Sequence, residues 1–143
     1  MLDAALEAVE KAYAPYSNFK VGAALRLEDG TIVTGNNQEN IAYPSGLCAE
    51  RVAVFAASAN HPGKAVEAIA ICSKSGEFEM DHPVTPCGAC RQSLFEYESN
   101  QDNGIRTILY GAAGEVWVVN SIRDLLPLTF EEQGLRKTGK VSK

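Results

Sequence analysis

The spacing of hydrophobic residues in the first part of the chain predicts a helix followed by two strands. Apolar residues recur at helical spacing over residues 2–12, and Pro15 ends that segment. Two strand-like runs follow at residues 21–27 and 32–35. The tripeptide Glu28-Asp29-Gly30 joins them, and it is typical of a hairpin turn because glycine tolerates positive φ. We therefore expect an opening helix and then a β-hairpin.

The rest of the chain alternates between helical and strand-like hydrophobic patterns. Helical patterns cover residues 49–59 and 88–97, and a short one covers 122–126 before Pro127. The apolar run at 66–72 has the length of a strand covered on both faces. Further strands are expected at 107–110 and 116–119. This order predicts an α/β fold, a three-layer α/β/α sandwich around a central five-stranded mixed sheet.

Length and composition narrow the class of protein. The 143 residues are enough for one domain with a core, so we expect residues 1–143 to form a single domain, with the last few as a candidate loose tail. The start of the chain lacks the pattern of a signal peptide and no apolar run is long enough for a membrane, so a cytoplasmic protein with no membrane partner is expected. The net charge of −5 argues against nucleic-acid partners.

Three of the four cysteines are candidate metal ligands. Cys87 and Cys90 are separated by two residues, which is ligand spacing, and Cys48 is their distant match. Paired disulfides would need an oxidising compartment, and Cys72 lies in an apolar run where a buried free thiol is expected. A redox pair and a purely structural zinc site stay open as alternatives. His82 is a competing ligand without a partner at ligand spacing.

Glu50 gives this group of cysteines a catalytic interpretation. Zinc held by three protein groups keeps a fourth position for water, and Glu50 follows Cys48 closely enough to move a proton of that water. Cysteines at helix starts are favoured as thiolates by the helix dipole. Three thiolates and Zn²⁺ sum to −1, so Arg51 and Arg91 are candidate compensators, with surface helix arginines as the alternative.

The segments that carry these residues resemble the zinc-dependent cytidine deaminases of the short, homotetrameric type. The likeness rests on Cys48-Ala49-Glu50-Arg51 and on Pro86-Cys87-Gly88-Ala89-Cys90-Arg91-Gln92. Segments 14–25, 37–43 and 125–130 extend it from about the first helix to Phe130. The resemblance implies one Zn²⁺ per chain and hydrolytic deamination of cytidine and deoxycytidine to uridine and deoxyuridine, with release of ammonia. It also implies a place in pyrimidine salvage and a homotetramer.

The same resemblance implies a role for each matching position. Cys48, Cys87 and Cys90 would bind zinc, and Glu50 would shuttle protons between a zinc-activated hydroxide and the base. Around the substrate, Asn37 and Glu39 would bind the ribose 3′-hydroxyl, Phe19 would pack against the pyrimidine, and the Ala49 N–H would meet the O2 atom of the base. Tyr43 and Phe130 would line the site of a neighbouring subunit. Arg51, Arg91 and Gln92 would lie around the metal ligands.

Each of these roles has a plainer alternative, and so does the function. Phe19 could belong to the core, Asn37 and Glu39 to a turn and the surface, and Tyr43 and Phe130 to ordinary packing. A deaminase of another amine, such as a blasticidin-type nucleoside, would share the metal and Glu50. An editor of polynucleotides is disfavoured, because Glu39 would repel a phosphodiester at the 3′ oxygen. A non-catalytic zinc domain would need a fourth protein ligand.

Overall fold

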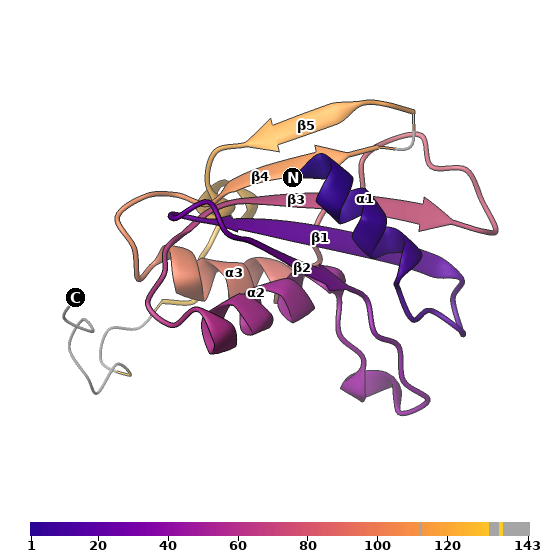
Figure 1. Cartoon of the computed structure of the whole chain (residues 1–143), viewed down its shortest axis with the longest axis horizontal. Helices are drawn as coiled ribbons and strands as arrows, with labels where there is room; N and C mark the ends of the chain where they lie inside the picture. Colours follow the sequence, from indigo (N-terminus) through magenta and orange to yellow (C-terminus); the bar gives the residue numbers. More distant parts are fainter. Residues whose placement is uncertain (112, 132–134, 136–143) are drawn as a thin grey trace.

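A computed structural model describes residues 1–111, 113–131 and 135 of the chain, and its centre is a five-stranded sheet (Figure 1). The strands are β1 (Phe19–Leu27), β2 (Ile32–Asn36), β3 (Val66–Ser75), β4 (Arg106–Tyr110) and β5 (Val116–Val119). They are arranged in the order β2-β1-β3-β4-β5. Only β3 and β4 pair in parallel, and the other neighbouring strands are antiparallel. The mixed sheet predicted from the sequence is confirmed.

Helices cover both faces of this sheet. Helix α1 (Leu2–Glu10) lies on one face, and α2 (Ala49–Asn60) and α3 (Gly88–Glu98) lie side by side on the other (Figure 1). The parallel β3–β4 pair requires a crossover connection, and α3 supplies it. Two short 3₁₀ helices, η1 (Tyr43–Ser45) and η2 (Ile122–Leu125), complete the described elements.

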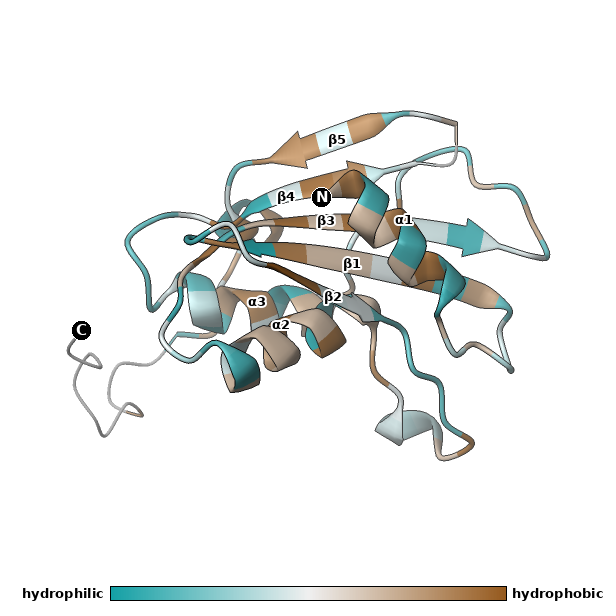
Figure 2. Cartoon of the chain, in the orientation of Figure 1, coloured by the Kyte–Doolittle hydropathy of each residue, from teal (hydrophilic) through white to brown (hydrophobic). Residues whose placement is uncertain are grey.

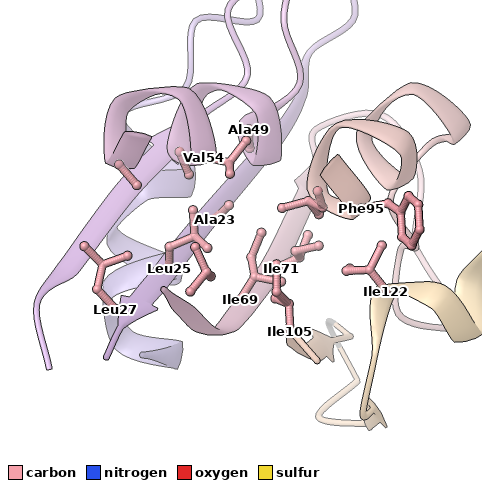
Figure 3. Packing of buried hydrophobic residues seen from close by; sticks show 14 of the residues in the cluster. Ala23, Leu25, Leu27, Ala49, Val54, Ile69, Ile71, Phe95, Ile105 and Ile122 are labelled. Carbon is pink, nitrogen blue, oxygen red and sulfur yellow. The ribbon is translucent and has the colours of Figure 1, made fainter. Parts of the chain in front are cut away.

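The main core fills the space between the sheet and the pair α2 and α3 (Figure 3). Leu25, Ile69 and Ile71 of the central strands meet Val54 and Phe95 of the two helices, and all five are almost fully buried. A smaller cluster seats α1 on the opposite face. Figure 2 shows that β3 is hydrophobic through its middle and hydrophilic toward its end, and residues 68–72 are buried, so the strand can occupy the middle of the sheet.

Glycine allows the edge strand β2 to approach α2 closely. A Cβ atom at Gly35 would lie 2.4 Å from the Ala53 nitrogen and 2.6 Å from the Ala49 carbonyl oxygen, which no real side chain tolerates. The strand and the first turn of α2 are therefore in backbone contact. This contact fixes the position of the helix start that follows Cys48.

The structure differs from the sequence prediction in several details. Helix α1 ends at Glu10 rather than at residue 12, because Tyr13 turns away to donate its N–H to the Asn37 carbonyl. Strand β3 continues to Ser75, since its last residues pair with the start of β1. The segment expected as a short helix at 122–126 is the 3₁₀ helix η2, and η1 was not predicted. Cys72 is a buried free thiol, as expected.

The expected loose tail falls on residues 136–143, which lie outside the described residues. Among the residues that are described, no helix combines the length and the apolar character needed to cross a membrane.

Candidate active site

Two helices that lie side by side begin directly after a cysteine each. Cys48 is the N-cap residue of α2 and Cys87 is the N-cap residue of α3. Both have extended backbone angles, and their carbonyl oxygens accept the first hydrogen bonds of the helices, from the Val52 and Arg91 N–H groups. The positive ends of two helix dipoles therefore face the same region, as expected for a site that stabilises thiolates.

The three predicted metal ligands converge in this region. The sulfur atoms of Cys48, Cys87 and Cys90 all lie within 4.8 Å of one another. The Cys48–Cys87 pair is separated by 3.9 Å and the Cys87–Cys90 pair by 3.4 Å. Sulfurs that share a tetrahedral zinc at normal bond lengths are separated by about 3.8 Å. The spacing and the all-thiolate donor set both fit zinc, and no other group of three such residues occurs in the described part of the chain.

The thiols of this group differ in acidity. A hydrogen bond from Cys90 and the Arg51 guanidinium together lower the pKa of Cys48 to about 5, against the effect of burial. The pKa of Cys90 is raised, because its thiol donates to Cys48 and is buried. One sulfur is thus ionised at neutral pH before any metal binds, which gives a cation an initial point of attachment.

Glu50 lies one residue into α2 from Cys48 and is buried, with 4% of its surface exposed. Burial raises the pKa of Glu50 above its ordinary value, and the negative charge of the Cys48 thiolate adds to that effect. A carboxyl group whose pKa is raised in this way can both accept and return a proton near neutral pH.

The two arginines that follow the ligands make different contacts. Arg51 donates from Nη2 to the Cys48 sulfur at 3.8 Å, as the charge argument from the sequence predicted. Arg91 instead donates from Nε to the Pro86 carbonyl at 2.7 Å and from Nη1 to the Leu125 carbonyl at 3.1 Å. Arg91 therefore holds the loop before Cys87 against the end of η2 rather than contacting a sulfur.

A cavity of about 480 Å³ opens beside Cys48. This volume is in the range of small-molecule sites. The segment that contains Asn37 and Glu39 reaches it because Gln38 pairs with Leu47 through two backbone hydrogen bonds of 2.9 Å, next to the metal ligand. The described lining residues are Tyr16, Ser17, Asn37, Gln38, Glu39, Asn40, Tyr43, Gly46, Leu47 and Cys48.

Of the remaining predicted substrate residues, Tyr43 lines this cavity, whereas Phe19 and Ala49 are not among its lining residues. Phe19 is half-buried at the start of β1 and stacks on Phe78, with ring centroids 5.9 Å apart. Ala49 is fully buried as the first residue of α2, a position whose N–H has no partner within a helix. Tyr43 is exposed in η1, with its ring edge toward Tyr16.

Phe130 is 70% exposed and does not line the cavity. Its carbonyl accepts a hydrogen bond of 3.2 Å from the Gln92 side chain, so these two predicted residues do meet. His82, the competing ligand, stacks on Trp117 and is not part of the sulfur group.

Sequence reasoning assigned no role to Tyr16 or Ser17, although both line the cavity. Their backbone N–H groups and the Ser17 hydroxyl all donate to Glu39, more than twenty residues away. A hydroxyl residue just before a strand is the only local signal, and it does not identify so distant a partner.

Comparison with known proteins agrees with this geometry. Residues 1–102 match the family model of the cytidine and deoxycytidylate deaminase zinc-binding region. A cytidine deaminase of Sporosarcina psychrophila is 41% identical over 129 residues, which cover 90% of this chain and 88% of that protein. One from Halalkalibacterium halodurans is 44% identical over 96 residues, 67% of this chain and 68% of the relative.

Solved structures of the same class share the fold. The cytidine deaminase of Burkholderia pseudomallei has a TM-score of 0.79 and 45% sequence identity, over 90% of this chain and 95% of that chain. The Mycobacterium tuberculosis enzyme has a TM-score of 0.71 and 33% identity, over 92% and 95% of the two chains.

Proposed function

This chain belongs to the cytidine and deoxycytidylate deaminase family, and from that membership we propose how its residues divide the work of deamination. The enzyme deaminates cytidine by hydrolysis. Water adds its oxygen to C4 of the pyrimidine, the bond to the exocyclic nitrogen breaks, and uridine and ammonia leave. The observation that carries the proposal is the convergence of three sulfurs with a buried carboxyl group whose pKa is raised.

Cys48, Cys87 and Cys90 would hold the Zn²⁺ ion, which when bound supplies acidification of water toward a pKa of about 7. The Arg51 guanidinium would reduce the excess negative charge of the three thiolates through its contact with Cys48. Arg91 would keep Cys87 in place by holding the Pro86 carbonyl.

Glu50 would perform the proton transfers. Its carboxylate takes a proton from the attacking water and gives one to ring N3. It then takes the remaining water proton from the new C4 hydroxyl and gives it to the amine nitrogen, so that the C4 carbonyl forms and ammonia leaves. Burial supports this role, because it brings the energies of the two protonation states of Glu50 closer together at neutral pH.

The substrate would lie in the cavity beside Cys48. Asn37 and Glu39 would bind the ribose 3′-hydroxyl, Phe19 would pack against the pyrimidine, and the Ala49 N–H would meet its O2 atom. The position of Asn37 and Glu39 in the lining supports the sugar contact, and the absence of a helical partner for the Ala49 N–H supports the last. Deoxycytidine would be accepted too, because no predicted contact requires the 2′-hydroxyl.

We further propose a homotetramer of single-domain chains, acting in the cytoplasm in pyrimidine salvage. The exposure of large apolar side chains supports an assembly. Tyr43 is 76% exposed and Phe130 is 70% exposed, and both would complete the site of a neighbouring subunit.

Replacing Glu50 tests the proposed mechanism. Glu50→Gln keeps the size of the side chain but cannot carry a proton, so ammonia release from cytidine should fall by about 10²–10⁴-fold. Zinc content, measured by atomic emission, should stay at one ion per chain. Glu67→Gln is the matched control, since Glu67 is half-exposed on β3 and pairs with Arg26. Near-normal turnover in Glu50→Gln would remove Glu50 from the mechanism.

A further inference from the structure

The carboxylate of Glu39 is held by a single turn of the chain, at residues 15–18. The Tyr16 N–H donates to Oε2 at 2.8 Å and the Ser17 N–H to the same oxygen at 3.3 Å. The Ser17 hydroxyl makes a short hydrogen bond to Oε1. Three donors therefore come from two consecutive residues, and they fix the direction in which the carboxylate points.

The direction of the Ser17 hydrogen bond follows from a second contact. The Phe19 N–H donates to the Ser17 oxygen at 3.1 Å. The hydroxyl has one hydrogen of its own, and it directs that hydrogen to the Glu39 carboxylate, which has only acceptors when ionised. Ser17 thus links Glu39 of the cavity wall to the backbone of Phe19, the residue proposed to pack against the base.

The Asn37 side chain also contacts the backbone at the start of β1. Its side-chain oxygen accepts from the Val21 N–H at 2.8 Å, and its Nδ2 donates to the Phe19 carbonyl at 2.9 Å. The backbone N–H and carbonyl of Phe19 are therefore held by Ser17 and Asn37 respectively. Because Asn37 holds the Phe19 carbonyl without Ser17, the proposed base-packing residue keeps a backbone anchor when the Ser17 hydroxyl is removed.

The same contacts leave the Glu39 carboxylate able to accept few further hydrogen bonds. An ionised carboxylate offers about four acceptor positions, and the turn occupies three of them. The free position is on Oε1, beside the Ser17 hydroxyl. Burial alone would raise the pKa of Glu39, but its hydrogen bonds with Ser17 and Tyr16 bring it below the ordinary value. The carboxylate is thus a charged acceptor suited to one further hydroxyl donor.

We propose that Ser17 is a positioning residue for sugar recognition, which orients Glu39 so that its one free acceptor position meets the 3′-hydroxyl of the nucleoside. The inference rests on the proposed function and extends it to a residue that does not itself contact the reacting atoms. Without the Ser17 hydroxyl, the carboxylate loses its hold at Oε1 and can rotate or bind water there.

The test compares cytidine with 3′-deoxycytidine, which lacks the hydroxyl in question, using the zinc-loaded enzyme. In Ser17→Ala, kcat/KM for cytidine should fall about tenfold. The loss should appear mainly in KM, because the weakened hydrogen bond between Glu39 and the 3′-hydroxyl serves the ground state and the transition state alike. For 3′-deoxycytidine the same substitution should change kcat/KM by less than about twofold. Ser17→Thr keeps the hydroxyl and should restore the preference for cytidine.

Two further variants make the result specific. In a Glu39→Gln background, adding Ser17→Ala should have no further effect on cytidine, because the two residues act as one unit. Ser58→Ala is the control, since Ser58 is exposed on α2 and does not line the cavity. Thermal unfolding of every variant confirms that it is folded.

The possible results separate the inference from the function on which it rests. Equal losses on both nucleosides in Ser17→Ala, or equal wild-type kcat/KM for the two, would overturn the role of Ser17 and leave deamination standing. Failure of the wild type to release ammonia from either nucleoside would overturn the proposed function, and the inference with it.

Discussion

Cys48 and Cys90 belong to the same group of sulfurs, and their interaction shifts the acidity of the two thiols in opposite directions. The pKa of Cys48 falls to about 5, whereas the pKa of Cys90 rises. Arg51 contributes to the first shift through its contact with the Cys48 sulfur. Cys72, buried in β3, differs from both because burial raises its pKa to about 11.

These differences predict a pattern of alkylation by iodoacetamide. In zinc-free protein at pH 7, Cys48 should react fastest, because only thiolates are nucleophilic. Its reaction should slow as the pH falls through about 5, where the Cys48 thiolate takes up a proton. Cys72 should stay unmodified at neutral pH. Peptide mass spectrometry gives the extent at each cysteine.

Zinc is the control for that experiment, because added Zn²⁺ should protect Cys48, Cys87 and Cys90 alike. Rapid labelling of Cys48 that zinc does not slow would contradict the assignment of its sulfur as a ligand.

The sequence could identify the site residues whose chemistry is rare, and it failed where a common residue acts through a distant contact. The metal ligands were predictable because cysteines at ligand spacing are uncommon by chance, and the charge argument predicted the Arg51 contact. The same argument applied to Arg91 did not anticipate its carbonyl partners, since Leu125 is 34 positions away along the chain. The role of Ser17 was not predictable either, since its partner Glu39 is 22 positions away along the chain.

At the scale of elements, the end of α3 is joined to η2 by one side chain. The carboxylate of Glu98 accepts hydrogen bonds from the Ile105 N–H at 2.6 Å and from the Ile122 N–H at 2.8 Å, through the same oxygen. Its other oxygen accepts from the Ser121 hydroxyl and the Arg123 N–H. Glu98 is buried, and it serves as a cap for the start of η2.

We predict that Glu98→Gln destabilises the protein by about 3 kcal/mol, because an amide nitrogen would replace one accepting oxygen and leave buried N–H groups without partners. Chemical denaturation gives the free energy of unfolding. Glu7→Gln, at an exposed position of α1, is the control and should change that free energy by no more than about 0.5 kcal/mol. An equally small change in Glu98→Gln would contradict a structural role for these four bonds.

The elements themselves were largely predictable, because their hydrophobic patterns are strong. The run at residues 66–72 predicted the central strand, whose partners on both sides are now identified as β1 and β4. The residues at which elements end were not predictable, because contacts with distant segments decide where a helix or strand stops. Tyr13 leaves the line of α1 by pairing with Asn37, and Glu98 accepts from the first N–H groups of η2.

At the scale of the whole molecule, large apolar side chains are exposed both on the segment beside the cavity and outside the cavity lining. Ile41 is 81% exposed, and Tyr43 and Phe130 are nearly as exposed. Ile41 and Tyr43 are two positions apart in the chain, and exposed apolar groups that lie together mark an interaction surface more often than isolated ones do. In the proposed assembly these side chains would be buried between subunits.

The assembly gives a prediction that links mass to activity. Sedimentation velocity of the wild type should show a species of about four times the 15.4 kDa chain mass. Phe130→Ala should weaken this species by removing a large buried side chain, and turnover of cytidine should fall together with it. Ile32→Ala, on the edge strand β2 and outside the cavity lining, should alter neither. A fully active monomer would contradict the proposal.

The ligands Cys48 and Cys87 are 39 positions apart in the sequence, and β3 lies between them. A metal ion bound by both is therefore a cross-link that closes a long stretch of chain, in the manner of a disulfide. Closing a loop of this length removes roughly 3–4 kcal/mol of conformational entropy from the unfolded chain. The ion that serves the chemistry would thereby also brace the two helices, so metal supply would govern how much folded enzyme exists as well as how fast it works.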